Sequence, residues 1–155
     1  MNSTNLIAEH IKQVYEGDNW TDVNIDDTIR NISWHQAQQK TNASPNTIAS
    51  LLHHLYYWNG VMMQRLKGSN PSTPGTNGYN VGELKTDEEW QALKEKTHES
   101  FLQLADLIKS FPEEKLSSTY AEGKSSYYKN FQGIVEHAYY HLGQIVILKK
   151  LILAG

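Results

Sequence analysis

The chain contains no cysteine, and several targeting features are missing as well. Without thiols, disulfides, thiolate metal sites and cysteine nucleophiles are all excluded. The N-terminus carries no basic segment followed by an apolar core, so we expect no signal peptide. No apolar run approaches the roughly 20 residues that span a bilayer. We therefore expect a cytoplasmic protein that does not interact with membranes.

Basic residues are scattered along the chain and form no stripe. The formal net charge is −3. Because phosphate neutralisation supplies most of the affinity for nucleic acids, this charge distribution argues against a nucleic acid partner. The length of 155 residues is enough to bury a core of its own, and we expect a single domain over residues 1–155.

Apolar residues recur at helical spacing along four long segments, and no segment shows the alternation of a strand. The expected long helices cover residues 5–16, 44–67, 86–110 and 126–153. Short helical turns are expected at 26–31 and 33–36. The stretch 68–85 is rich in Pro, Gly, Asn and Ser, and a loop of this length is usually a functional lid or a crossover. The pattern predicts an all-α fold, a left-handed four-helix bundle with long inter-helix connections.

The most informative residues are His137 and His141 on the last expected helix. A spacing of four places both imidazoles on one helix face, with Cβ atoms about 5–6 Å apart, which suits a shared metal ion. They lie on an otherwise apolar stripe, where unpaired polar groups are costly. An alternative is a pair of histidines at the edge of the core that is satisfied by hydrogen bonds.

A third imidazole is available on the second expected long helix, which carries the pair His53 and His54. At about 100° per residue, His54 borders the apolar stripe of that helix, whereas His53 points largely to solvent. His54, His137 and His141 would supply three metal ligands and leave an open position, as in catalytic zinc sites. Imidazoles equally suit nickel, copper or ferrous iron, so we expect a divalent metal (Zn, Ni or Fe).

Other polar and aromatic residues near these histidines are weaker candidates. Gln144 lies on the same stripe and could hydrogen-bond a ligand imidazole, or simply link two helices. Tyr140 is a candidate for lining the pocket, and Glu136 is expected to be solvated rather than to act as a general base. Aromatic residues expected in the core are Trp20, Trp34 and Trp58.

Several segments together resemble the DinB-like (YfiT-like) superfamily of metal-dependent enzymes over nearly the whole chain. The matching segments are Tyr15-Glu16-Gly17 with Trp20, Ile32 to Ala37, Thr47 to Trp58, Arg65 to Gly68 and Gly133 to Ile145. The family pattern places one ligand on the second helix and two more as H-x-x-x-H ahead of Gly-Gln-Ile. The resemblance therefore implies His54, His137 and His141 as ligands, in agreement with the angular argument. The doubled histidine at 53 and 54 departs from a simple match.

The resemblance also implies a function. Members of this family include transferases and isomerases that use an external low-molecular-weight thiol, and others are called hydrolases. A metal-dependent thiol S-transferase, isomerase or hydrolase with a small-molecule substrate is thus the first hypothesis. The alternative is a non-catalytic protein that binds a metal or small ligand under stress, and a third possibility is a purely structural role. Because such bundles commonly pair, we expect a homodimer through the apolar tail Ile145–Leu153.

Overall fold

A computed structural model describes residues 2–155, and within this range every element is helical. The four long helices are α1 (Ser3–Tyr15), α4 (Ile48–Leu66), α5 (Asp87–Lys109) and α6 (Tyr127–Ala154). Shorter elements are α2 (Ile25–Ile29), α3 (Trp34–Ala37) and the 3-10 helix η1 (Glu113–Lys115). The all-α prediction is confirmed.

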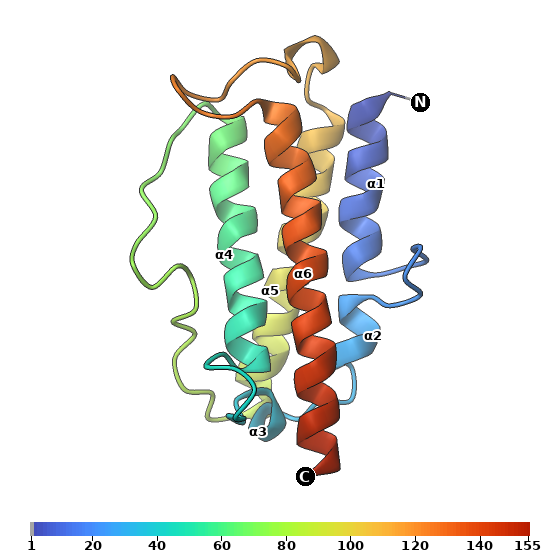
Figure 1. Cartoon of the computed structure of the whole chain (residues 1–155), viewed down its shortest axis with the longest axis vertical. Coiled ribbons are helices and arrows are strands. Elements are labelled where there is room, and N and C mark those ends of the chain that lie inside the picture. Colours follow the sequence, from blue (N-terminus) through green and yellow to red (C-terminus); the bar gives the residue numbers. More distant parts are fainter. Residues whose placement is uncertain (1) are drawn as a thin grey trace.

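The long helices lie side by side, and each packs against two others (Figure 1). Helix α1 contacts α5 and α6, and α4 contacts the same two helices. In Figure 1, α1 and α6 run downward while α4 and α5 run upward, so α4 and α6 are antiparallel neighbours. Between the helices lies an apolar core whose largest fully buried side chains include Trp90, Phe101 and Phe131. The histidines of interest lie on the neighbouring pair α4 and α6.

The segment from residue 67 to 86 returns from the end of α4 to the start of α5, which makes these two neighbours parallel (Figure 1). The segment is therefore a crossover connection, one of the two roles expected for a loop of this length. Its middle part is also docked against α4, because Trp58 Nε1–H donates a hydrogen bond to Asn77 Oδ1 at 3.1 Å. The loop therefore both connects the two helices and covers part of the α4 surface.

Helix α4 begins three residues later than the sequence suggested. The expected start at Ser44 and Pro45 is wrong, because residues 41–44 form a turn instead. Thr47 is the N-cap: its side chain accepts from the Ser50 N–H, and the Ser50 hydroxyl oxygen accepts from the Thr47 N–H. This reciprocal capping satisfies two backbone donors at once, which outweighs the preference of proline for a first turn.

The three tryptophans expected in the core differ in their exposure. Trp20 is 100% exposed, so its assignment to the core is wrong. It lies in the connection between α1 and α2, where no helical period predicts which side chains face inward. Trp34 and Trp58 are partly buried against the core, and Trp90 is the tryptophan that the core encloses.

The end of α6 exposes apolar side chains. Ile147, Leu151 and Leu153 are between 46% and 58% exposed, whereas Ile145 and Leu148 face the core. Pairing of two copies through this surface stays a prediction. Within residues 2–155, none of the helices combines the length and apolar character that crossing a membrane requires.

Candidate metal centre

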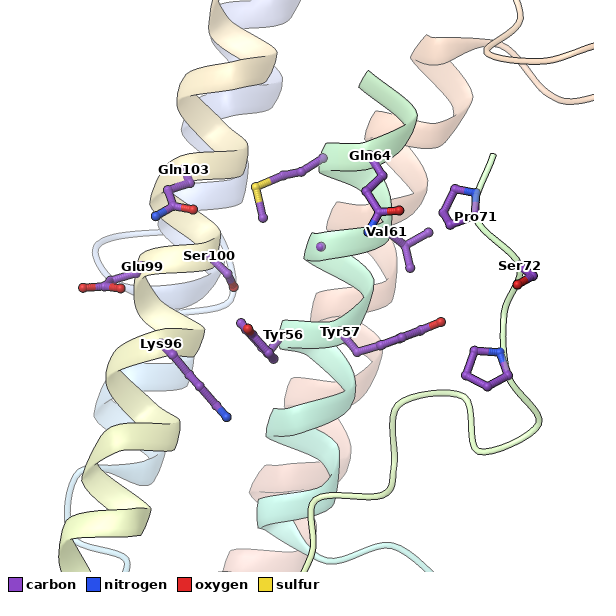
Figure 2. A pocket seen from close by; sticks show the side chains of 13 residues that line it. Tyr56, Tyr57, Val61, Gln64, Pro71, Ser72, Lys96, Glu99, Ser100 and Gln103 are labelled. Atoms are coloured by element: carbon purple, nitrogen blue, oxygen red, sulfur yellow. The ribbon is translucent and has the colours of Figure 1, made fainter. Parts of the chain in front are cut away.

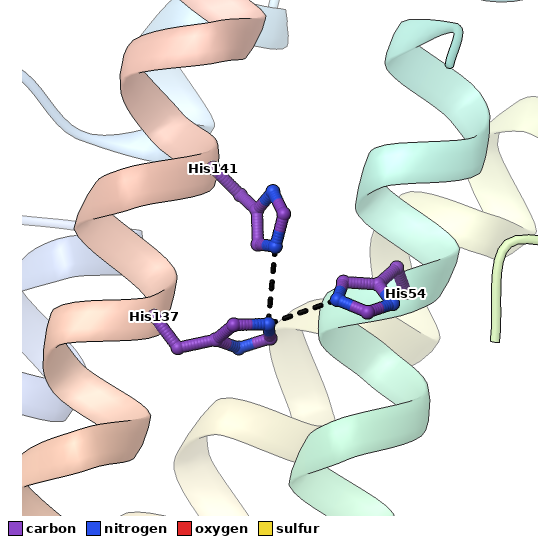
Figure 3. Close-up of side chains that lie close together, drawn as sticks. All are labelled: His54, His137 and His141. Carbon is purple, nitrogen blue, oxygen red and sulfur yellow. Dashed lines mark hydrogen bonds between the residues drawn. The ribbon is translucent and has the colours of Figure 1, made fainter. Parts of the chain in front are cut away.

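Three imidazoles from two helices converge at one point (Figure 3). His54 projects from α4, and His137 and His141 project from successive turns of α6. Nε2 of His137 lies 2.9 Å from Nε2 of His54 and 3.0 Å from Nε2 of His141. One nitrogen from each ring lies within 4.8 Å of the other two, so these side chains could hold a metal ion. His54 and His141 are buried, at 2% and 4% exposure.

The tautomers of two of these imidazoles follow from their neighbours. Nδ1–H of His54 donates to the carbonyl oxygen of Asn77 at 2.5 Å, and a carbonyl only accepts. Nδ1–H of His141 donates to Oε1 of Gln144 at 2.6 Å. Since a neutral imidazole carries one proton, both rings present an Nε2 lone pair to the centre of the cluster.

Hydrogen bonds within the protein do not satisfy all the imidazole nitrogens of this cluster. His137 has at most one Nε2–H to offer to the two lone pairs that face it, and its buried Nδ1 has no hydrogen-bond partner within residues 2–155. Either tautomer of His137 therefore leaves buried polar atoms unpaired, at a cost of roughly 1–3 kcal/mol each. A divalent cation would accept all three Nε2 lone pairs, so the residues present fit a metal ion.

The surroundings also keep the imidazoles neutral. Burial, followed by the neighbouring histidines, lowers the pKa of His137 from 6.5 to about 3. Burial lowers the pKa of His54 to about 4, although the hydrogen bond to Asn77 acts in the opposite direction. The pKa of His141 is also lowered, again by burial. Neutral rings retain the lone pairs that metal binding requires.

The loop 67–86 supplies contacts that the sequence did not predict. Asn77 accepts from both His54 and Trp58, and its positive φ of 51° suits an asparagine in a tight turn. The Tyr79 ring stacks on His54 with ring centroids 4.0 Å apart and an angle of 3° between the planes. His53 does not point freely to solvent as expected: it is partly buried, and its Nδ1–H donates to the Gly78 carbonyl at 2.6 Å.

Gln144 and Tyr140, the two weaker candidates from the sequence, lie next to His141. Gln144 binds Nδ1–H of His141 through Oε1, and its Nε2–H donates to the Tyr140 hydroxyl at 3.4 Å. Tyr140 is 65% exposed, and its ring centroid lies 5.0 Å from that of His141. Tyr140 thus lies at the edge of the cluster, where its ring packs edge-on against His141 and its hydroxyl accepts from Gln144. Glu136 is exposed, as expected.

Among the described residues, a cavity beside α4 borders two of the histidines, and a larger cavity beside α4 does not. A cavity of about 440 Å³ is bordered by His54 and His137, together with Trp58, Met62 and Ile134. A larger cavity of about 590 Å³ lies between α4, α5 and the loop, where Tyr56, Tyr57 and Lys96 line it (Figure 2). None of the three histidines lines the larger cavity, so the smaller one is the cavity that adjoins the candidate metal centre.

No curated protein and no solved structure matches the chain. A sequence model of the DinB superfamily matches residues 18–145, which include α4, α5 and the histidine-bearing part of α6. The chain therefore belongs to the DinB superfamily.

Proposed function

We propose that the chain is a metal-dependent enzyme built on a left-handed four-helix bundle. His54, His137 and His141 would hold one divalent ion through their Nε2 atoms. The proposal is supported by the 2.9 Å and 3.0 Å separations of these atoms and by the two lone pairs that Asn77 and Gln144 direct inward. All-imidazole donors suit zinc, nickel or ferrous iron.

The surrounding residues have separate roles in this proposal. Asn77 and Gln144 orient two of the imidazoles, and Tyr140 supports the amide of Gln144. Trp58, Met62 and Ile134 form apolar walls beside the histidines. When bound, a divalent ion supplies Lewis-acid activation of a water molecule or of a thiol.

The absence of acidic groups in the cavity favours thiol chemistry. In the part of the chain that the structure describes, no aspartate or glutamate lines the 440 Å³ cavity. Activation of water by a general base needs a proton acceptor within hydrogen-bond reach. A thiol, with an ordinary pKa of about 8.5, loses its proton far more easily than water. Because the chain has no cysteine, the thiol must come from outside. We therefore place S-transfer to an electrophile, or isomerisation through a thiol adduct, ahead of hydrolysis.

A turnover assay tests this proposal. Zinc- or nickel-loaded protein is mixed with a small thiol and 1-chloro-2,4-dinitrobenzene, and separately with 4-nitrophenyl acetate in the absence of thiol. We expect thiol conjugation, with a loss of at least about 100-fold in His141→Ala and no change in His10→Ala, which alters an exposed histidine.

Two outcomes would contradict the proposal. Ester cleavage without thiol conjugation would identify a hydrolase and contradict the preference for thiol chemistry. If the protein bound metal but turned over none of a wider panel of electrophiles, esters and amides, the site would be a non-catalytic metal- or ligand-binding site.

A further inference from the structure

The cavity beside the histidines has a cationic end. Arg65 on α4 and Lys129 on α6 both line it, together with Ser125 and Asn130. Arg65 follows His54 by eleven residues and Lys129 precedes His137 by eight, which is a rise of roughly 16 Å and 12 Å along the two helices. Because α4 and α6 are antiparallel, both displacements have the same direction (Figure 1). The two cations therefore lie at one end of the cavity and the histidines at the other.

The protein does not neutralise these two charges. Among residues 2–155, neither Arg65 nor Lys129 forms a salt bridge, and no acidic residue lines the cavity. Nη1–H of Arg65 donates to Oδ1 of Asn130 at 3.0 Å, but its Nε is buried and has no hydrogen-bond partner. The buried Nε–H is not accessible to a ligand, so an oxyanion in the cavity would be bound by the remaining Nη N–H groups of this guanidinium, which has no counter-ion.

The side chain of Trp58 lies close to both the cation and the histidines. The Trp58 ring centroid lies 5.6 Å from Cζ of Arg65 and 6.1 Å from the ring centroid of His137. The ring of Tyr120 also contacts the guanidinium, with its centroid 4.7 Å from Cζ of Arg65. These aromatic contacts fix Arg65 in place without cancelling its charge. A small molecule in the cavity could thus reach both the guanidinium and the imidazoles.

We infer that this cavity takes a small organic substrate or co-substrate with an oxyanion end group, which Arg65 and Lys129 bind while the rest of the molecule extends toward His54 and His137. The inference rests on the proposed function, because it assigns this cavity to the reaction at the histidines. Carboxylates and phosphates share the required chemistry. The volume of about 440 Å³ lies within the range of small-molecule sites.

Binding of simple anions to the metal-free protein tests the inference. Glutarate, its uncharged diamide glutaramide, and inorganic phosphate are titrated while the Trp58 Nε1–H signal is followed by NMR. We expect a saturable shift with glutarate or phosphate and none with glutaramide. The preferred anion then distinguishes a carboxylate from a phosphate end group.

Charge variants locate the binding site. Arg65→Gln should weaken anion binding at least about tenfold, since hydrogen bonds to charged groups are the strong ones. Lys129→Glu changes an exposed residue, which leaves folding intact, and should also weaken anion binding several-fold. Lys67→Gln removes an exposed positive charge close to Arg65 but outside the cavity lining, and should leave the affinity unchanged.

The outcomes separate this inference from the proposed function. Equal binding of glutarate and glutaramide, no binding of either anion, or wild-type affinity in Lys129→Glu would overturn it. Because the titration uses metal-free protein, it succeeds or fails independently of metal binding and turnover. Anion binding without any metal binding would instead contradict the proposed function.

Discussion

Zinc added to the metal-free protein is expected to raise its thermal unfolding midpoint by roughly 8–16 °C. An ion present at about 1,000 times its dissociation constant stabilises the folded state by about 4 kcal/mol. For a chain of this size, each kcal/mol corresponds to roughly 2–4 °C. The stabilisation follows from the geometry, because only the folded chain brings together His54, His137 and His141.

Alanine variants test whether zinc stabilises the protein by binding at the three histidines. His137→Ala and His141→Ala should each remove most of the zinc-induced rise, whereas His10→Ala should keep it, since His10 is exposed and distant in sequence from the cluster. The comparison uses the shift caused by zinc, so a change in the stability of the metal-free variant does not affect it. A similar rise in all three variants would show that zinc binds elsewhere.

Gly78→Ala should lower the metal affinity about 10- to 100-fold, although Gly78 contributes no ligand. Its backbone has a φ of +76°, and an added Cβ would lie 2.6 Å from Cβ of Tyr57. The loop must therefore move away from α4. Movement would withdraw the Asn77 carbonyl from Nδ1–H of His54 and the Gly78 carbonyl from His53. Loss of such an orienting partner typically costs this much affinity.

Gly75→Ala is the matched control in the same loop. An added Cβ at Gly75 meets no atom within 4 Å, and its φ is not positive. Zinc titration by calorimetry measures both variants, and imidazole nitrogen NMR reports the tautomer of His54. Equal zinc affinities for the two variants would show that the loop does not support the site.

The helices and the central histidines could be predicted because both obey a helical period. The angular argument correctly placed His54 at the core edge, and the spacing of four placed His137 and His141 on one face. The expected helix limits at residues 126 and 110 also agree with the observed N-cap Ser126 and C-cap Ser110. Periodic patterns report which face of a helix is buried, and the three histidines lie where two such faces meet.

The residues around the three histidines could not be predicted in this way, because no periodic pattern in the sequence marks them. Asn77 and Gly78 form an Asn-Gly pair, which indicates a turn but not the surface on which the turn docks. Arg65 and Lys129 look like ordinary charges near helix ends, and only the antiparallel packing of α4 and α6 brings them to one cavity. His53 was misplaced because the angular argument considers one helix and omits the loop that covers it.

The zinc content of the chain after equilibrium dialysis tests the central claim most directly. Untagged protein and its His54→Ala, His137→Ala and His141→Ala variants are dialysed against the same low zinc concentration and analysed for metal. We predict about one ion per chain for the natural sequence and almost none for each variant, since three imidazoles define the site. A natural chain without zinc, or a His54→Ala variant that retains a full ion, would contradict the shared site.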